Sequence, residues 1–456
     1  MSFAPSAPTT SDQLLQAVET VTSITDRPEI ERVEIQVADT DPLLWLAAQT
    51  GGPALYWRGR GDREARAALG AARSVNARSL EEASLTDAGD ALPAGARMWL
   101  TARFDTDAEV GHEWLAFGGV RLVLPRVELR QRGRDCTLSV YILPGETAEE
   151  VMDAIGELQP PVDSDAELDL PFMRRDDPDR SEWGRMLRWA FGSFSRRRLD
   201  KVVLARRARF TFEQPVDAVA LMQRLEAATP RCYHALVAPR GLTGPTFVTA
   251  TPERLIRVRG AEVETEAVAG TRPRAELDAT DDELRDELLS SEKDRREHAF
   301  VRSAIGAALT PLARHVETDD ETTAMTLARG RHLRTGIRAT LADDIGPLDV
   351  LRALHPTPAV GGTPTRQSLD AIRRLEPFDR GLYAGPIGWI GRDDDGQQSA
   401  DVSVGIRSGL VNQRTLSLYS GAGIVPGSTP SAEWAEIEHK IGDFARVLGL
   451  AERIEA

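Results

Sequence analysis

The last third of the chain contains three strand-like stretches: LYAGPIGWIG (Leu382–Gly391), ADVSVGIRSGLV (Ala400–Val411) and TLSLYSGAGIV (Thr415–Val425). Their β-branched and aromatic residues favour extended structure, and glycine and polar residues separate them. A helix-like stretch from about Pro430 follows. Strand runs and helix runs both occur without the regular βαβ alternation of a doubly wound fold, so the pattern favours an α+β fold with large antiparallel sheets.

Strand-like and helix-like stretches also occur before these three strands, and we assign residues 181–452 to one region that is rich in motifs. An arginine-rich amphipathic helix is predicted over Ser181–Arg198, and it leads into the strand DKVVLARRARFTF (Asp200–Phe212). Further strands are predicted at Cys232–Ala238, Pro245–Val258 and Glu262–Val268, with long helical sequence over Asp281–Leu309.

The N-terminal part of the chain differs from this region in composition and in its predicted elements. Residues 1–12 are rich in Ser, Pro and Thr and are predicted to form a disordered tail. Residues 13–180 form the N-terminal part of the fold and end in a polar connector, PPVDSDAELDLP (Pro160–Pro171). We predict helices at Gln13–Thr22, Arg63–Gly70 and Ala148–Leu158 and strand structure at Glu113–Leu129.

Composition narrows the class of protein. The 456 residues are 41% hydrophobic and 28% charged, which is globular composition, and the net charge is −15. An acidic chain repels polyanions, so nucleic acid and an anionic membrane are not expected as partners. The two cysteines, Cys136 and Cys232, signal neither a disulfide framework nor a zinc site. No long apolar run or signal pattern is seen, and we expect a cytoplasmic protein.

Basic residues show an unusual bias. Of the 56 lysines and arginines only three are lysine: Lys201, Lys293 and Lys440. A GC-rich genome explains the preference for arginine. A lysine that persists against this bias is a candidate for a position where arginine cannot serve, because lysine can lose its proton and acts as a compact point charge.

Eight motifs in a fixed order carry a family resemblance across about 240 residues. They are KVVLAR (Lys201–Arg206), TPERLI (Thr251–Ile256), AVAGTRPR (Ala267–Arg274), SEKDRREH (Ser291–His298), HPTPAVGGTP (His355–Pro364), LYAGPIGW (Leu382–Trp389), GIRSGL (Gly405–Leu410) and YSGAGIVPGSTPSAEWAEIEHK (Tyr419–Lys440). The chain resembles the chorismate-utilising enzymes, and among them the isochorismate synthases. The resemblance implies one large domain in which two antiparallel sheets pack together with helices outside.

The resemblance also implies a reaction. Chorismate would become isochorismate by Mg²⁺-dependent addition of water at ring carbon 2 and loss of the hydroxyl at ring carbon 4, feeding menaquinone or siderophore biosynthesis. Such a reaction requires a base near the incoming water, an acid near the leaving oxygen, and positive charge for two carboxylates. Mg²⁺ suits one of those carboxylates because it prefers oxygen ligands.

Residue roles follow from the matching motifs. Lys201 matches the family's water-activating base, and Glu253 resembles its general acid, which would need a raised pKa and a partly desolvated position. His332, in RHLRTGI, matches a histidine near the substrate ring. The ordinary alternatives are a surface lysine, a strand-end glutamate and a structural histidine.

The remaining roles concern the metal and the substrate. Glu297 and Glu436 resemble the two Mg²⁺ ligands, although each also has a lysine four residues away on a helix and would form an ordinary ion pair with it. The residues nominated to bind substrate are Gly270, Thr271, Arg407, Gly421, Gly423 and Lys440.

The motif variants favour one member of the family. Aminodeoxychorismate synthases carry lysine in the slot of Ala269, and anthranilate synthases differ in the segment that here reads HPTPAVGGTP. Salicylate synthase and anthranilate synthase component I remain the alternative assignments. One departure is Ala400-Asp401-Val402, where isochorismate synthases usually have Gly-Glu-Phe. We expect this departure to alter the packing beside Arg407.

Two readings from other classes remain open. A catalytically inactive relative acting as a partner subunit is disfavoured by intact Lys201, Glu253, Glu297 and Glu436. An ammonia-using enzyme is disfavoured by the lack of a glutaminase segment in the sequence, so no obligatory amidotransferase subunit is expected.

Overall fold

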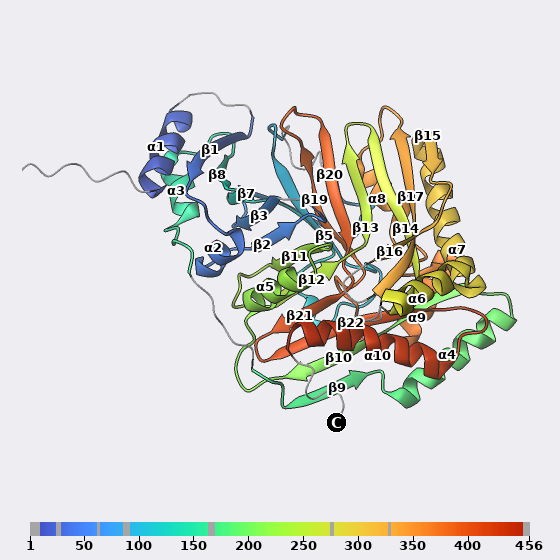
Figure 1. The fold of residues 1–456 in the computed structure, drawn as a ribbon. Coiled ribbons are helices and arrows are strands. Elements are labelled where there is room, and N and C mark those ends of the chain that lie inside the picture. The colour runs from blue at the N-terminus through green and yellow to red at the C-terminus, as the bar shows by residue number, and fades with distance from the viewer. Residues whose placement is uncertain are drawn as a thin grey trace, which may run out of the picture.

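The computed structural model describes residues 10–23, 29–61, 64–84, 92–162, 169–273, 278–326 and 330–449. Its strands form two large sheets, and every pairing between described strands is antiparallel. Figure 1 shows the two sheets side by side with helices around their outer sides. The prediction of an α+β fold with two packed antiparallel sheets and helices outside is confirmed.

The first sheet is built from both ends of the chain. Its order is β1-β8-β7-β3-β2-β11-β12-β21-β22-β10-β18, with β9 paired to β10. The strands are β1 (Glu31–Val37), β2 (Ala54–Arg58), β3 (Glu64–Leu69), β7 (Val127–Arg132), β8 (Asp135–Ile142), β9 (Met173–Asp177), β10 (Lys201–Thr211), β11 (Tyr233–Ala238), β12 (Thr246–Thr251), β18 (Gly362–Thr363), β21 (Ser408–Asn412) and β22 (Thr415–Ile424).

The second sheet has the order β15-β17-β14-β13-β20-β19-β5-β6-β4, with β16 paired to β17. Its strands are β4 (Arg73–Ala77), β5 (Arg97–Ala102), β6 (Val120–Leu124), β13 (Arg254–Arg259), β14 (Glu262–Pro273), β15 (Ala313–Thr318), β16 (Thr323–Thr326), β17 (Gly330–Leu341), β19 (Pro386–Arg392) and β20 (Gln398–Val404). Because strands from before and after residue 180 pair in both sheets, the two sequence regions form one domain.

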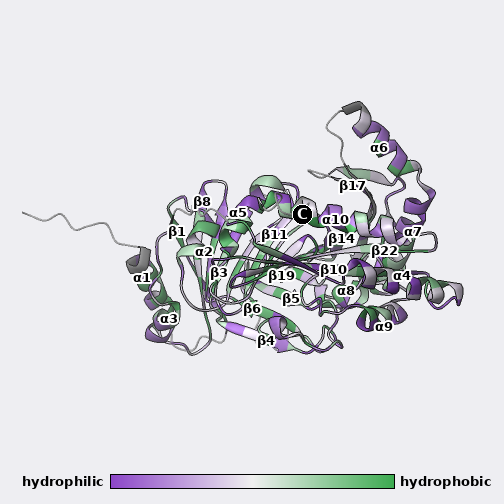
Figure 2. Cartoon of the chain, turned by 90° about the horizontal axis from the view of Figure 1, so that it is seen from below, coloured by the Kyte–Doolittle hydropathy of each residue, from purple (hydrophilic) through white to green (hydrophobic). Residues whose placement is uncertain are grey.

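The helices lie outside the sheets. They are α1 (Thr10–Thr22), α2 (Pro42–Ala48), α3 (Ala148–Ile155), α4 (Arg180–Ser195), α5 (Ala218–Ala228), α6 (Asp278–Ser290), α7 (Glu292–Leu309), α8 (Pro347–Leu354), α9 (Thr365–Leu375) and α10 (Pro430–Val447), with short 3₁₀ turns η2 (His112–Trp114) and η3 (Thr310–Leu312). Helix α7 packs on β14 and β17, and α10 packs on β22. In Figure 2 the peripheral helices carry hydrophilic and hydrophobic residues together, as amphipathic helices covering a sheet do.

Local sequence explains several helix boundaries. Helix α4 begins with a capping box, in which the Asp179 side chain accepts a hydrogen bond from Glu182 N and the Glu182 side chain accepts one from Asp179 N. Helix α10 begins with Thr429 as its cap and Pro430 in the first turn. None of the helices in the described segments combines the length and apolar character needed to cross a membrane.

Three sequence-based assignments were wrong in whole or in part. The predicted strand structure over Glu113–Leu129 begins within the 3₁₀ turn η2 and contains strand β6 and only the start of β7. The stretch predicted as a helix over Arg63–Gly70 contains strand β3, which lies between β2 and β7 in the first sheet. Its alanines and leucine favour a helix locally, but pairing with two neighbouring strands overrides that preference. Helix α1 begins at Thr10, so the predicted tail over 1–12 extends three residues too far, and residues 1–9 lie outside the described segments.

Candidate active site

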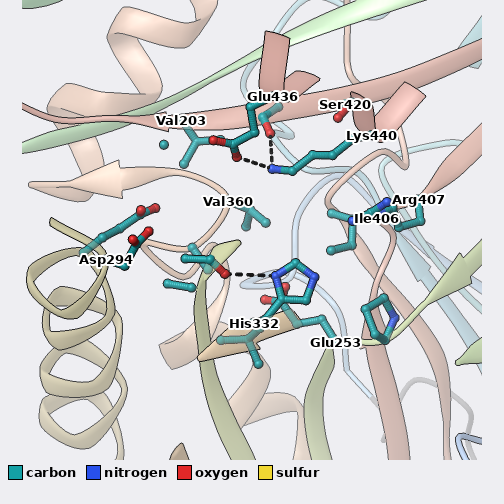
Figure 3. Close-up of a pocket in the computed structure, with 18 of the residues that line it drawn as sticks. Val203, Glu253, Asp294, His332, Val360, Ile406, Arg407, Ser420, Glu436 and Lys440 are labelled. Atoms are coloured by element: carbon teal, nitrogen blue, oxygen red, sulfur yellow. Dashed lines mark hydrogen bonds and ion pairs between the residues drawn. The ribbon is translucent and has the colours of Figure 1, made fainter. Parts of the chain in front are cut away.

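A cavity of about 220 Å³ lies where the chain passes between the two sheets. One passage joins β12 to β13 and carries Glu253, and another joins β20 to β21 and carries Arg407. A hydrogen bond of 3.1 Å from Val404 N to Glu253 O ties the two passages together. Figure 3 shows Glu436 and Lys440 on one side of the cavity and Glu253 and His332 on the other.

Lys201 is the first residue of β10 and is fully buried. Its Nζ lies 2.9 Å from Glu297 Oε1, and the two atoms form an ion pair without hydrogen-bond geometry. Lys201 does not itself line the cavity, but Glu297 and Gly423, which lie next to it, do. A Cβ atom at Gly423 would collide with Glu297 Oε1 and approach Lys201 Cε to 3.0 Å, so any other residue there would displace one of these two side chains.

Glu253 lines the cavity and is 7% exposed. Burial raises the pKa of its carboxyl to about 8, and the negative charge of Glu266 acts in the same direction. The positive charges of Lys201, Arg60 and Lys440 oppose that shift without cancelling it. Glu253 is therefore largely protonated at neutral pH, as a general acid must be.

His332 lies on β17 and also lines the cavity. Its Nδ1 donates a hydrogen bond of 3.0 Å to the carbonyl oxygen of Gly270, since a carbonyl only accepts. Burial, together with the positive charges of Arg407 and Lys440, lowers the pKa of the imidazole to about 3. The ring is consequently neutral, with its hydrogen on Nδ1.

Gly270 sits at an irregularity in the pairing of β14 with β17, and its φ angle is 74°. A Cβ atom there would lie 3.0 Å from the Cβ of Asp294. Glycine therefore suits both the backbone conformation and the close approach of helix α7. Thr271 follows in β14, but its side chain lies outside the described part of the chain.

Glu297 on α7 and Glu436 on α10 face the cavity from different helices. Each is paired with a lysine, because Glu436 Oε1 accepts a hydrogen bond of 2.7 Å from Lys440 Nζ and Glu297 pairs with Lys201. Lys293, which was expected to pair with Glu297, instead donates a hydrogen bond from its Nζ to Glu433 Oε1 at 3.1 Å.

This donor set fits Mg²⁺. The two predicted ligands, Glu297 and Glu436, carry carboxylates, which are the hard oxygen ligands that Mg²⁺ prefers. The glycine at position 423 leaves room for the Glu297 side chain. Among the described residues, no cluster of three or more His, Cys, Asp or Glu side chains surrounds one point. The protein would thus supply two carboxylates and leave the other positions to substrate and water, which is common for Mg²⁺.

Arg407 and Lys440 bring two basic side chains to the cavity. Arg407 adopts a φ of 50°, which is unusual for a residue with a side chain, and this conformation presents it at the passage between the sheets. No carboxylate of the described residues pairs with its guanidinium. Lys440 Nζ is oriented by a hydrogen bond of 3.1 Å to Gly421 O.

The predicted site residues therefore converge. All of them line this cavity except Lys201, which lies behind Glu297, and Thr271, whose side chain is not described. Sequence reasoning missed several lining residues: Lys293, Asp294, Tyr383, Ser420 and the apolar Val203, Val360 and Ile406. A signal was available for Lys293, because all three lysines of the chain meet around this cavity.

The departure at Ala400-Asp401-Val402 lies away from this cavity. Asp401 pairs with Arg257 at 2.8 Å on the second sheet and lines a separate polar cavity. None of the three residues lines the candidate active site.

Comparison with known proteins agrees with this geometry. The family model of the chorismate binding enzymes matches residues 14–449. The salicylate biosynthesis isochorismate synthase of Pseudomonas aeruginosa is 34% identical over 448 residues, covering 93% of this chain and 91% of that protein. Chloroplastic isochorismate synthase 2 of Arabidopsis thaliana is 33% identical over 364 residues, covering 76% of this chain and 63% of that protein's length.

A solved structure shows the same arrangement of the chain. MenF, the menaquinone-specific isochorismate synthase from Escherichia coli, superposes with a TM-score of 0.79 at 29% identity, covering 95% of this chain and 99% of that one. The match includes the region that carries the cavity. The chain belongs to the chorismate-binding enzyme family, among its isochorismate synthases.

Proposed function

We propose that this protein converts chorismate to isochorismate. The observation that carries the proposal is the cavity in which a largely protonated Glu253 lies together with Arg407 and Lys440 and with the carboxylates of Glu297 and Glu436. The proposal is also supported by relatives named isochorismate synthase. The experiment that tests it is identification of the product formed from chorismate.

The residues divide the reaction between them. Water attacks ring carbon 2 and its proton goes to the base, for which Lys201 in its neutral form, released from the ion pair with Glu297, is our candidate. The ring double bond shifts, and the carbon 4 hydroxyl leaves as water with the proton of Glu253. One water enters and one leaves, so the change is an isomerisation. Arg407 and Lys440 hold substrate carboxylates, and Arg407 offers a bidentate contact.

Lys201 lies behind Glu297 in the cavity wall, so its contact with the incoming water depends on the position of that carboxylate. Neutral His332 accepts or donates hydrogen bonds near the ring without adding charge. When bound at Glu297 and Glu436, Mg²⁺ would supply positive charge against a substrate carboxylate.

Product analysis separates this function from its alternatives. Isochorismate has the mass of chorismate but a different absorbance and retention, whereas salicylate and anthranilate have both lost pyruvate. A product of lower mass would favour one of these alternatives, and dependence on ammonia would single out the anthranilate reaction. We propose that the protein acts in the cytoplasm without an amidotransferase partner, and that isochorismate supplies a menaquinone or siderophore route.

A first prediction concerns the metal. Excess chelator should abolish turnover, and Glu297→Gln and Glu436→Gln should each lower it by about 10² or more, because two carboxylates hold the ion. Calorimetric titration of Mg²⁺ in the presence of chorismate should show the loss of binding directly. Glu292→Gln, an exposed residue on the same helix α7, is the matched control. Full activity in chelator would remove Mg²⁺ from the proposal.

A second prediction concerns Ala269, which lines the cavity and carries no amine. No covalent adduct with the ring should form at this segment, and isochorismate supplied to the enzyme should return chorismate. Intact-protein mass spectrometry during turnover tests the first expectation, and chromatography of the reverse reaction tests the second. An adduct on the peptide containing Ala269 would contradict the assigned subtype.

A further inference from the structure

The main chain on both sides of Glu253 is held by one ion pair from distant parts of the sequence. Arg60 belongs to the turn between β2 and β3, and its Nη1 donates to Pro252 O and, at 2.6 Å, to Glu266 Oε1. The Nη2 group donates to Glu266 Oε2 at 2.9 Å. Glu266 Oε1 in turn accepts from Arg254 N at 3.1 Å. The pair thus contacts the residue before Glu253 and the residue after it.

The rest of this short segment is also fixed through its main chain. Glu253 N donates to Thr251 Oγ1 at 3.2 Å, and Glu253 O accepts from Val404 N. No hydrogen bond from a described residue holds the Glu253 carboxyl itself. Its position in the cavity consequently depends on how rigidly this backbone is held.

Glu266 also supplies charge. Its side chain is completely buried and accepts hydrogen bonds from Arg60 and, at 2.7 Å, from Arg334 Nε. Burial acts to raise the pKa of Glu266, but the hydrogen bonds and charge of Arg60, with the bond from Arg334, hold it below its ordinary value. Glu266 therefore stays ionised at neutral pH.

Several other charged or titratable groups face Glu253. Lys201 comes from β10, Lys440 from α10 and Arg60 from the β2–β3 turn, and all three favour the ionised carboxyl. Tyr383, which precedes β19, senses the Glu253 charge, and its own pKa is raised well above the ordinary value, chiefly by burial. Glu266 is the only negative group among the principal influences on Glu253 in the described residues.

We propose that the Arg60–Glu266 pair is a positioning unit for the proton donor: its hydrogen bonds fix the main chain on both sides of Glu253, and Glu266 contributes a buried negative charge to the surroundings of that carboxyl. This inference rests on the proposed role of Glu253. It gives the β2–β3 hairpin, in the N-terminal part of the fold, a direct role in the active site.

The test is the pH dependence of turnover in Glu266→Gln. Glutamine keeps the shape of the side chain but removes the charge, so Glu253 should lose its proton at lower pH. We expect the alkaline fall in kcat to move to lower pH by about one unit, with about a fivefold loss at pH 8 that recovers toward pH 6. Glu264→Gln on the same strand, which pairs with Arg254, is the control and should leave the alkaline fall in place.

Arg60→Gln tests the hydrogen bonds of the pair. It removes the contact to Pro252 O and both contacts to Glu266, so kcat should drop at every pH because the main chain that carries Glu253 is less firmly held. Infrared difference spectra against Glu253→Gln provide a readout without turnover. At pH 7 the band of a protonated carboxyl should be present in the wild type and weaker in Glu266→Gln.

The outcomes distinguish a failure of the proposed function from a failure of the inference about Arg60 and Glu266. If wild-type protein does not isomerise chorismate, the proposed function fails whatever the variants do. If it does, but Glu266→Gln lowers kcat equally at all pH values and leaves the infrared band unchanged, Glu266 has a structural role only and the inference is overturned. Should Glu266→Gln not fold, Arg60→Gln decides: a kcat equal to that of the wild type would overturn the inference.

Discussion

Lys201→Arg and Lys201→Ala should both lose about 10² to 10⁴ in kcat, because a positioned base typically contributes that much to rate. The loss corresponds to roughly 3 to 5 kcal/mol of barrier. Arginine keeps the positive charge but remains protonated, so it cannot accept a proton from water. If Lys201 only neutralised Glu297, from which its Nζ lies 2.9 Å, the arginine variant would retain much of the activity.

Lys440→Arg is the informative comparison, since Lys440 is proposed to act through its charge alone. Arginine preserves that charge, and we expect turnover within about tenfold of the wild type. Steady-state conversion of chorismate gives kcat for each variant, and binding of chorismate with Mg²⁺ is measured separately. Because Lys201 is fully buried and arginine is larger, circular dichroism and the smaller Lys201→Ala control for disrupted packing. An active Lys201→Arg would exclude Lys201 as the base.

The sequence carried most of the site because the site is assembled from local motifs. Lys201, Glu253, Glu297, Arg407 and Glu436 each lie in a short pattern that could be recognised without knowing what surrounds it. Their convergence on one cavity depends on the pairing of β10 with β22 and on the two passages between the sheets, which no local pattern specifies.

The residues that were missed act through long-range contacts. Arg60 is separated from Glu266 by 206 positions, and as one of many arginines it gave no signal of its own. Its role becomes visible only when the β2–β3 turn is placed beside the segment carrying Glu253. The same reason explains the error at Arg63–Gly70, where helix-forming residues occupy an internal strand because their neighbours complete a sheet.

The sequence predicted that the pKa of Glu253 must be raised, but it did not show what raises it. Sequence reasoning required a raised pKa for Glu253, and the structure supplies the cause: a 7% exposed carboxyl that faces the ionised Glu266. The position of Lys201 behind Glu297, rather than at the cavity surface, was not predictable, because it depends on the glycine at 423 admitting the Glu297 carboxylate.

Glu253→Gln should lower kcat by about 10² to 10⁴, because an amide cannot give a proton to the departing hydroxyl. The variant should also change the pH dependence of stability. The pKa of Glu253 is raised to about 8 in the folded protein, above the ordinary value near 4.5, so the folded state binds the proton more tightly than the unfolded state. Stability contributed by this group is present below the ordinary value and is lost as pH rises toward 8.

Glutamine carries no such penalty, so Glu253→Gln should be more stable than the wild type at pH 8, and the difference should shrink toward zero near pH 4. Chemical denaturation of both proteins across this range measures the two free energies of unfolding. Loss of turnover together with a gain in stability is the expected signature of a group strained for catalysis, since a merely structural glutamate would lose both. A variant that keeps its activity, or one whose stability difference does not grow with pH, would contradict the assignment of Glu253 as a buried proton donor.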